Sequence, residues 1–85
     1  MGLNDIKGLA ALQKLLLRNN ALLTLPAEIF QGLTALRALD LRSNQLSELP
    51  ARIFHGLTAL EHLGLSNNRL SELPAICDGD VRCLE

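Results

Sequence analysis

Leucines and polar residues recur along this chain with one fixed spacing. Residues 36–59 (LRALDLRSNQLSELPARIFHGLTA) are nearly copied by the residues on either side, with a step of 24 residues and no gaps. Leu15, Leu39 and Leu63 hold one equivalent position, and other leucines, an asparagine and a Leu-Pro pair recur in the same way. Because a fixed period of roughly 20–50 residues is the signature of stacked structural units, the repeat decides the architecture.

Each copy contains a short stretch in which apolar and non-apolar residues alternate. In the sequence ALDLR, Leu39 and Leu41 fall on one side of an extended chain, whereas Ala38, Asp40 and Arg42 fall on the other. All copies are reached by the same kind of connection, so the three strands must lie parallel. The pattern therefore predicts a parallel sheet whose leucine side faces a shared core.

An asparagine follows each predicted strand, at Asn20, Asn44 and Asn68. A buried amide side chain carries both donors and acceptors. We expect these asparagines to satisfy backbone groups of their own turn and of the next one, and so to be structural residues.

The rest of each copy predicts the back of the coil. Phe30 and Phe54 are expected to stack there as an apolar spine. Pro50 fixes φ and removes an N–H group, so this side cannot extend a sheet. Gly56 is expected to free the backbone for the turn into the next strand.

The segments LQKLLLRNNAL, LRALDLRSNQL and LEHLGLSNNRL match the pattern L-x-x-L-x-L-x-x-N-x-L. In this the chain resembles the leucine-rich repeat family over residues 3–76. The following LxxLPxxIFxGLxx is similar to the 24-residue repeat of variable lymphocyte receptors and Toll-like receptor ectodomains. The resemblance implies a leucine-rich repeat solenoid (α/β class by convention), with a short parallel sheet on the concave face and an irregular or 3-10 convex side. It also implies an extracellular or secreted location, no cofactor and no catalytic residues.

The period divides the chain into segments that together form one domain. They are a partial repeat or amino-terminal cap (1–11), two full repeats (12–35 and 36–59), a truncated third (60–76) and a carboxy-terminal cap or tail (77–85). One such coil cannot bury its own apolar face, and about three are needed for stability. Uncapped ends would expose sheet edges, so homo-oligomer formation through the solenoid ends is one expectation.

The composition of the chain limits the kinds of core and partner that it can have. The 22 leucines, with no Trp or Tyr, predict an aliphatic core. A net charge of −1 supplies no strong field to attract nucleic acid, and no apolar run is long enough to span a membrane. With nucleic acid and membrane disfavoured, the resemblance to leucine-rich repeats implies a protein ligand as the partner.

The outward side of the strands supplies the candidate binding residues. These are Lys14, Leu16, Arg18, Asp40, Arg42, His62 and Ser66. Stacking brings Arg18 beside Arg42 in a mildly basic patch that could grip a carboxylate in bidentate fashion, although the face could equally be merely solvated. Leu16 is either an apolar anchor for a partner or a tolerated surface leucine.

The tail departs from the repeat and holds the only two cysteines, Cys77 and Cys83. One reading is a disulfide-closed loop, turning at Asp78-Gly79, that caps the last repeat. The other reading is a pair of cysteines whose natural partners are missing or lie in another chain. Neither a calcium loop around Asp78 and Asp80 nor a four-ligand zinc site is complete, so no metal is predicted.

Two functions remain open. The first is a non-catalytic protein-binding module, part of a larger recognition protein, that binds through the concave strand face. The alternative is a minimal structural or engineered repeat fragment that mainly self-associates. An enzyme is disfavoured because His55 falls on the back of the coil, at the position of Gln31, and His62 has no acid at a fixed register to orient it. A shallow face of three strands also offers no cavity that excludes water.

Overall fold

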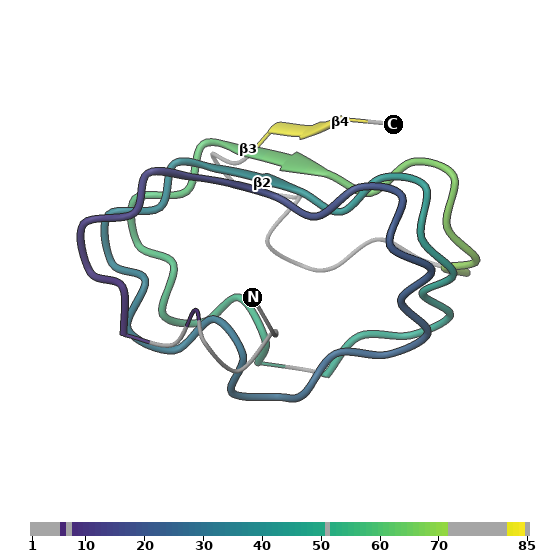
Figure 1. Cartoon of the computed structure of the whole chain (residues 1–85), viewed down its shortest axis with the longest axis horizontal. Coiled ribbons are helices and arrows are strands. Elements are labelled where there is room, and N and C mark those ends of the chain that lie inside the picture. The colour runs from purple at the N-terminus through teal and green to yellow at the C-terminus, as the bar shows by residue number, and fades with distance from the viewer. Residues whose placement is uncertain (1–5, 7, 51, 72–81, 85) are drawn as a thin grey trace.

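The chain winds into stacked coils with its strands on one side and its turns on the other (Figure 1). The computed structural model describes residues 6, 8–50, 52–71 and 82–84. A parallel sheet in the order β1-β2-β3-β4 forms one wall of the coils. Its strands are β1 (Lys14–Leu16), β2 (Ala38–Asp40), β3 (His62–Gly64) and β4 (Arg82–Leu84). The predicted parallel stack is confirmed.

Strand pairing follows the repeat in the first three coils. Leu15 lies beside Leu39, and Leu39 lies beside Leu63. Each strand spans only three residues, so the alternating apolar and polar pattern is longer than the strand that forms. The predicted sides are nevertheless correct, because Leu39 and Leu41 are 1% and 0% exposed.

The fourth strand was not predicted. Cys83 of β4 pairs in register with Leu63, twenty residues further along the chain instead of twenty-four. A parallel pair constrains the register of its strands but not the length of the connection beyond a minimum of about a dozen residues. The tail can therefore extend the sheet without keeping the repeat. The proposed partner Cys77 lies outside the described residues.

The core is aliphatic, with a row of aromatic rings at the back. The Phe30 and Phe54 rings are stacked, with centroids 6.1 Å apart and planes 12° from parallel. This confirms the predicted spine. Ile6, which lies 24 residues before Phe30, is also buried. The largest side chains with under 2% exposure are Phe30, Ile29, Leu33, Leu36, Leu39, Leu41, Leu46 and Leu63.

The buried Asn44 side chain joins two coils. Its Oδ1 accepts hydrogen bonds from the backbone N–H groups of Asn20 and Leu22, at 3.0 and 3.1 Å. Its Nδ2 donates to the carbonyl oxygens of Leu41 and Leu17, at 2.9 and 3.0 Å. The structural role is as predicted, but the expected direction was wrong, because the bonds reach the preceding turn and not the next. A repeat pattern does not reveal which neighbour an amide faces.

The other two asparagines show the same geometry in part. Asn68 Oδ1 accepts from Leu46 N at 3.0 Å, and its Nδ2 donates to Leu41 O at 2.9 Å. Asn20 Nδ2 bonds only carbonyls of its own turn, those of Leu17 and Arg18. The ladder of amides therefore ends at the first coil.

Turns and bends form the convex side, where the described residues contain no α-helix. The expected freedom of Gly56 is not used: its φ lies outside the left-handed region, and an added Cβ would meet nothing within 4 Å. Gly32 is the glycine that the turn requires. Its φ is +85°, and an added Cβ would approach the Gly8 Cα to 3.0 Å.

Candidate functional site

The outward side of the sheet gathers all the candidate binding residues in rows. We call this surface the strand face. Parallel register places Lys14, Ala38 and His62 in one row, and Leu16, Asp40 and Gly64 in the next. Over the first three coils, this set comprises Lys14, Leu16, Arg18, Ala38, Asp40, Arg42, His62, Gly64 and Ser66.

Asp40 is the centre of the strand face and is only 7% exposed. The Arg42 side chain grips its carboxylate from one side, with Nε 2.9 Å from Oδ1 and Nη2 2.9 Å from Oδ2. The Arg42 backbone N–H donates to Oδ1 at 3.1 Å. Arg18 reaches across from the first coil and donates from Nε to Oδ2 at 2.8 Å. One acid therefore holds two arginines together.

The hydrogen bonds to Asp40 keep it ionised. The Arg42 guanidinium is the main reason that the pKa of the Asp40 carboxyl lies well below its usual range. Burial opposes this shift, whereas the Arg42 backbone N–H and Arg18 reinforce it. The same contact raises the pKa of Arg42. At neutral pH the cluster of Arg18, Asp40 and Arg42 therefore carries a net charge of +1.

Gly64 makes room for this arrangement. A Cβ at Gly64 would lie 3.0 Å from Arg42 Cγ and 3.1 Å from Asp40 Oδ1. The Arg42 side chain therefore lies across the third coil at a position where any larger residue would displace it. Sequence reasoning treated Asp40 and Arg42 as separate binding residues. Their spacing of two along the predicted alternating stretch, which puts both on the same side, was the signal for the pair.

The remaining strand-face residues are more accessible. Leu16 is 58% exposed, in agreement with its expected outward direction. Lys14 and His62 are exposed, and Ser66 is half-buried. The face thus combines a fixed charged cluster, an accessible apolar side chain and polar residues around them.

A family model described as leucine rich repeat matches residues 10–70, more than two thirds of the chain. The chain belongs to the leucine-rich repeat family. No curated protein matches it in a sequence search. Leucine-rich repeats are protein-interaction scaffolds, so the chain is a protein-interaction module in this general sense.

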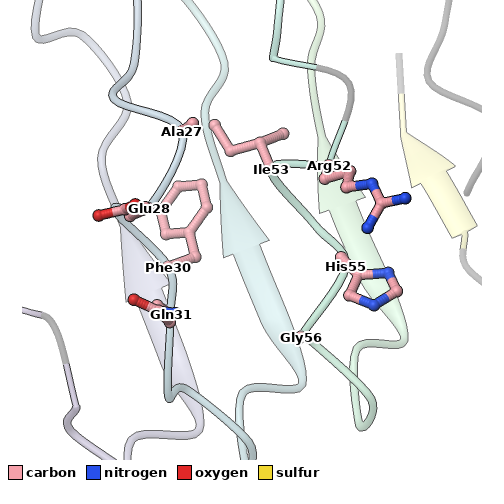
Figure 2. Close-up of a pocket in the computed structure, with 8 residues that line it drawn as sticks. All are labelled: Ala27, Glu28, Phe30, Gln31, Arg52, Ile53, His55 and Gly56. Carbon is pink, nitrogen blue, oxygen red and sulfur yellow. The ribbon is translucent and has the colours of Figure 1, made fainter.

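The opposite side of this leucine-rich repeat carries a shallow pocket of about 220 Å³ (Figure 2). It lies between two successive convex turns, above the buried Phe30 and Ile53. Its lining residues are Ala27, Glu28, Phe30, Gln31, Arg52, Ile53, His55 and Gly56. His55 is thus on the convex side and His62 on the strand face, so these two histidines cannot act together.

The described part of this leucine-rich repeat offers neither a metal site nor a membrane-spanning helix. Within it, no three side chains among His, Cys, Asp and Glu converge as metal ligands would. The same residues include no helix with the length and apolarity that a membrane crossing requires. Asp78 and Asp80 of the tail lie outside the described residues.

Proposed function

We propose that this leucine-rich repeat binds a protein partner through its concave strand face. The observation that carries the proposal is the cluster of Arg18, Asp40 and Arg42 beside the accessible Leu16. Each guanidinium uses Nε and Nη2 on Asp40. An arginine has five N–H donors, so each keeps donors directed away from Asp40.

This geometry favours a partner that presents a carboxylate next to an apolar group. The cluster is positively charged overall, and Lys14 adds a further positive charge on the same face. Asp40 also fixes both arginine side chains before a partner arrives. Because long side chains lose rotamer freedom on binding, fixing them beforehand lowers the entropic cost of association. Leu16 would bury its side chain against the apolar group of the partner.

Site-specific photo-crosslinking tests the proposal with a matched pair of positions. The photoreactive residue p-benzoylphenylalanine replaces either His62, on the strand face, or His55, on the convex side. Both positions are exposed, so proteins that bind nonspecifically should crosslink to both equally. We expect one protein to crosslink from position 62 and not from position 55 in extracts of the cells that express the chain.

Charge reversal then tests the chemistry. Lys14→Glu changes the strand face without touching the Asp40 carboxylate, whereas reversing Arg18 or Arg42 would leave that buried acid without its partners. Arg52→Glu, on the convex side, is the control. The Lys14 change should abolish the position-62 crosslink and the Arg52 change should not. Equal labelling from both histidine positions, or no effect of Lys14→Glu, would refute binding through this face.

A further inference from the structure

The outer edge of β1 presents backbone groups that pair with no strand among the described residues. β1 ends the strand order. Gln13 O accepts from Ala38 N at 3.1 Å, and Leu17 N donates to Asp40 O at 2.8 Å, so the odd-numbered residues of this stretch face β2. Because successive residues of a strand point their backbone groups to opposite sides, Lys14 and Leu16 face away from β2. We call these groups of Lys14 and Leu16 the β1 edge.

The equivalent groups in the next coil are all used. Ala38 and Asp40, the counterparts of Lys14 and Leu16, supply the N–H and C=O groups that bond the first coil. Asn44 Oδ1 likewise accepts two backbone N–H groups from the preceding coil. The same oxygen of Asn20 meets no donor among the described residues. The β1 edge therefore repeats a pairing surface that this molecule already uses between its own coils.

The side chains around the β1 edge are also less covered than their counterparts. Leu15 and Leu17 point inward but remain half-buried, whereas Leu39 and Leu41 are 1% and 0% exposed. On the opposite side of the strand, Leu16 is 58% exposed. Apolar surface thus flanks the edge both toward the core and toward the strand face.

The positive charges beside the β1 edge indicate which kind of ligand it would bind. Lys14 is exposed and the Arg18 side chain is 49% exposed, and the two flank Leu16 on the strand face. We propose that the β1 edge binds an extended peptide segment as an added strand, with the side-chain pattern acidic, apolar, apolar, apolar, acidic. The acids would lie beside Lys14 and Arg18, and the three apolar residues would cover Leu15, Leu16 and Leu17. Backbone hydrogen bonds would supply affinity, and the alternating side chains would supply specificity.

A second copy of the chain fits this edge less well. An antiparallel pair of β1 edges centred on Leu16 would place Lys14 of one copy opposite Arg18 of the other. Like charges directly opposite one another destabilise a strand pair. Self-association of two β1 edges in this arrangement therefore meets an electrostatic obstacle that an acidic peptide does not.

The test uses a fluorescein-labelled peptide, Gly-Ser-Glu-Val-Val-Val-Glu-Ser-Gly, and a control in which lysine replaces both glutamates. Fluorescence anisotropy measures binding of each to the whole chain. We expect the glutamate peptide to bind at least tenfold more tightly than the lysine peptide. The difference should shrink at high salt, because salt screens exposed charges. Equal affinities, or no binding of either peptide at millimolar protein, would overturn the proposal.

Variants at Leu16 separate the edge from nonspecific apolar binding. Leu16→Pro removes the outward N–H, and proline is compatible with an edge strand whose N–H faces solvent. This substitution should lower the affinity for the glutamate peptide at least tenfold, and circular dichroism should show that the fold is kept. Leu23→Ser is the control, since Leu23 is 59% exposed but lies outside the strands. Unchanged binding by Leu16→Pro, or equal weakening by Leu23→Ser, would contradict binding at the edge.

Amide hydrogen exchange keeps the proposal testable if Leu16→Pro does not fold. Adding the glutamate peptide to the unmodified chain should slow exchange at the Lys14 and Leu16 amides and leave the convex-side amides unchanged. If those two amides are unaffected, the proposal is wrong. Sedimentation across a dilution series tests whether a second copy of the chain binds there instead. A dimer that forms without peptide, persists in Leu16→Thr and is lost in Leu16→Pro would show that a second copy occupies the edge and would overturn the proposal. These outcomes are independent of the crosslink at position 62.

Discussion

Replacing Asn44 by alanine should cost far more stability than the same change one coil earlier. Asn44 is 6% exposed and satisfies two backbone N–H groups and two carbonyls, of which those of Asn20, Leu22 and Leu17 belong to the preceding coil. Asn20 occupies the equivalent position but is exposed and bonds only carbonyls of its own turn. The two substitutions are chemically identical, so their difference isolates the bridge between coils.

The magnitude follows from the groups that lose partners. Each buried polar group left unsatisfied costs about 1–3 kcal/mol, and the lower end applies where water can reach the group. Asn44→Ala leaves the backbone N–H groups of Asn20 and Leu22 without an acceptor. The carbonyls of Leu17 and Leu41 keep hydrogen bonds from the other two asparagines. Both N–H contacts are partly buried, so the low end gives about 2 kcal/mol for Asn44→Ala. Water can replace both contacts of Asn20, so Asn20→Ala should cost less than about 1 kcal/mol. A domain of this length has a total stability of roughly 4–13 kcal/mol, so the larger loss is a substantial part of it.

Urea denaturation followed by circular dichroism measures both values, with the slope of the transition as a check that the unfolded states are comparable. Asn68→Ala should fall between the two, because Asn68 makes one fewer bond to a backbone N–H than Asn44 does. If Asn20→Ala and Asn44→Ala cost the same, or if Asn44→Ala costs less than about 1 kcal/mol, the inferred bridge contributes little and the reasoning fails.

Three further changes test other parts of the structure. Ala21 has a φ of 55°, a left-handed conformation that is strained for any residue with a Cβ. Ala21→Gly should therefore raise the free energy of unfolding by up to about 1 kcal/mol and shift the urea midpoint upward, whereas a lower midpoint would contradict this strain. Because folding lowers the Asp40 pKa, the stability it contributes is present above the unfolded pKa of about 4 and is lost as pH falls further. Asp40→Asn should therefore be less stable at pH 7 and lose this acid dependence. If the stability of the variant and of the unmodified chain changes in parallel with pH, the Asp40 carboxylate does not have this role. Gly64→Ala should cost about 1–2 kcal/mol by displacing Arg42, whereas Gly56→Ala should be neutral or slightly stabilising; equal urea midpoints for the two variants would refute the close packing.

The repeat period made the leucine frame predictable from sequence. Leu15, Leu39 and Leu63 must be equivalent, and equivalent residues of a stack must lie side by side, so register followed directly. The period carries no information about which neighbour a side chain faces, because every coil has one on each side. That is why the direction of the Asn44 hydrogen bonds was missed. The unpredicted β4 has a related cause, since it keeps the register of the sheet but not the spacing of the repeat.

The candidate site was predictable as a face but not as a cluster. Alternation within a strand identified which side chains point outward. The repeat placed Arg18 beside Arg42 and suggested two cations ready for a partner. In the structure the Asp40 carboxylate lies between them and uses part of each guanidinium. This contact depends on the reach of arginine across to the next coil, which a one-dimensional pattern does not contain.

The two proposed surfaces meet at Leu16 and make different demands on it. Binding through the strand face needs the Leu16 side chain, whereas adding a strand to the β1 edge needs its outward backbone N–H. Leu16→Thr removes the apolar contact and keeps the N–H, so it should abolish the apolar part of face binding and only weaken the edge. Leu16→Pro removes the N–H as well, so the further loss from threonine to proline reports the edge alone. Because Leu16 is 58% exposed, neither loss should arise from the core. A peptide that binds the threonine and proline variants equally would assign all of Leu16's contribution to its side chain.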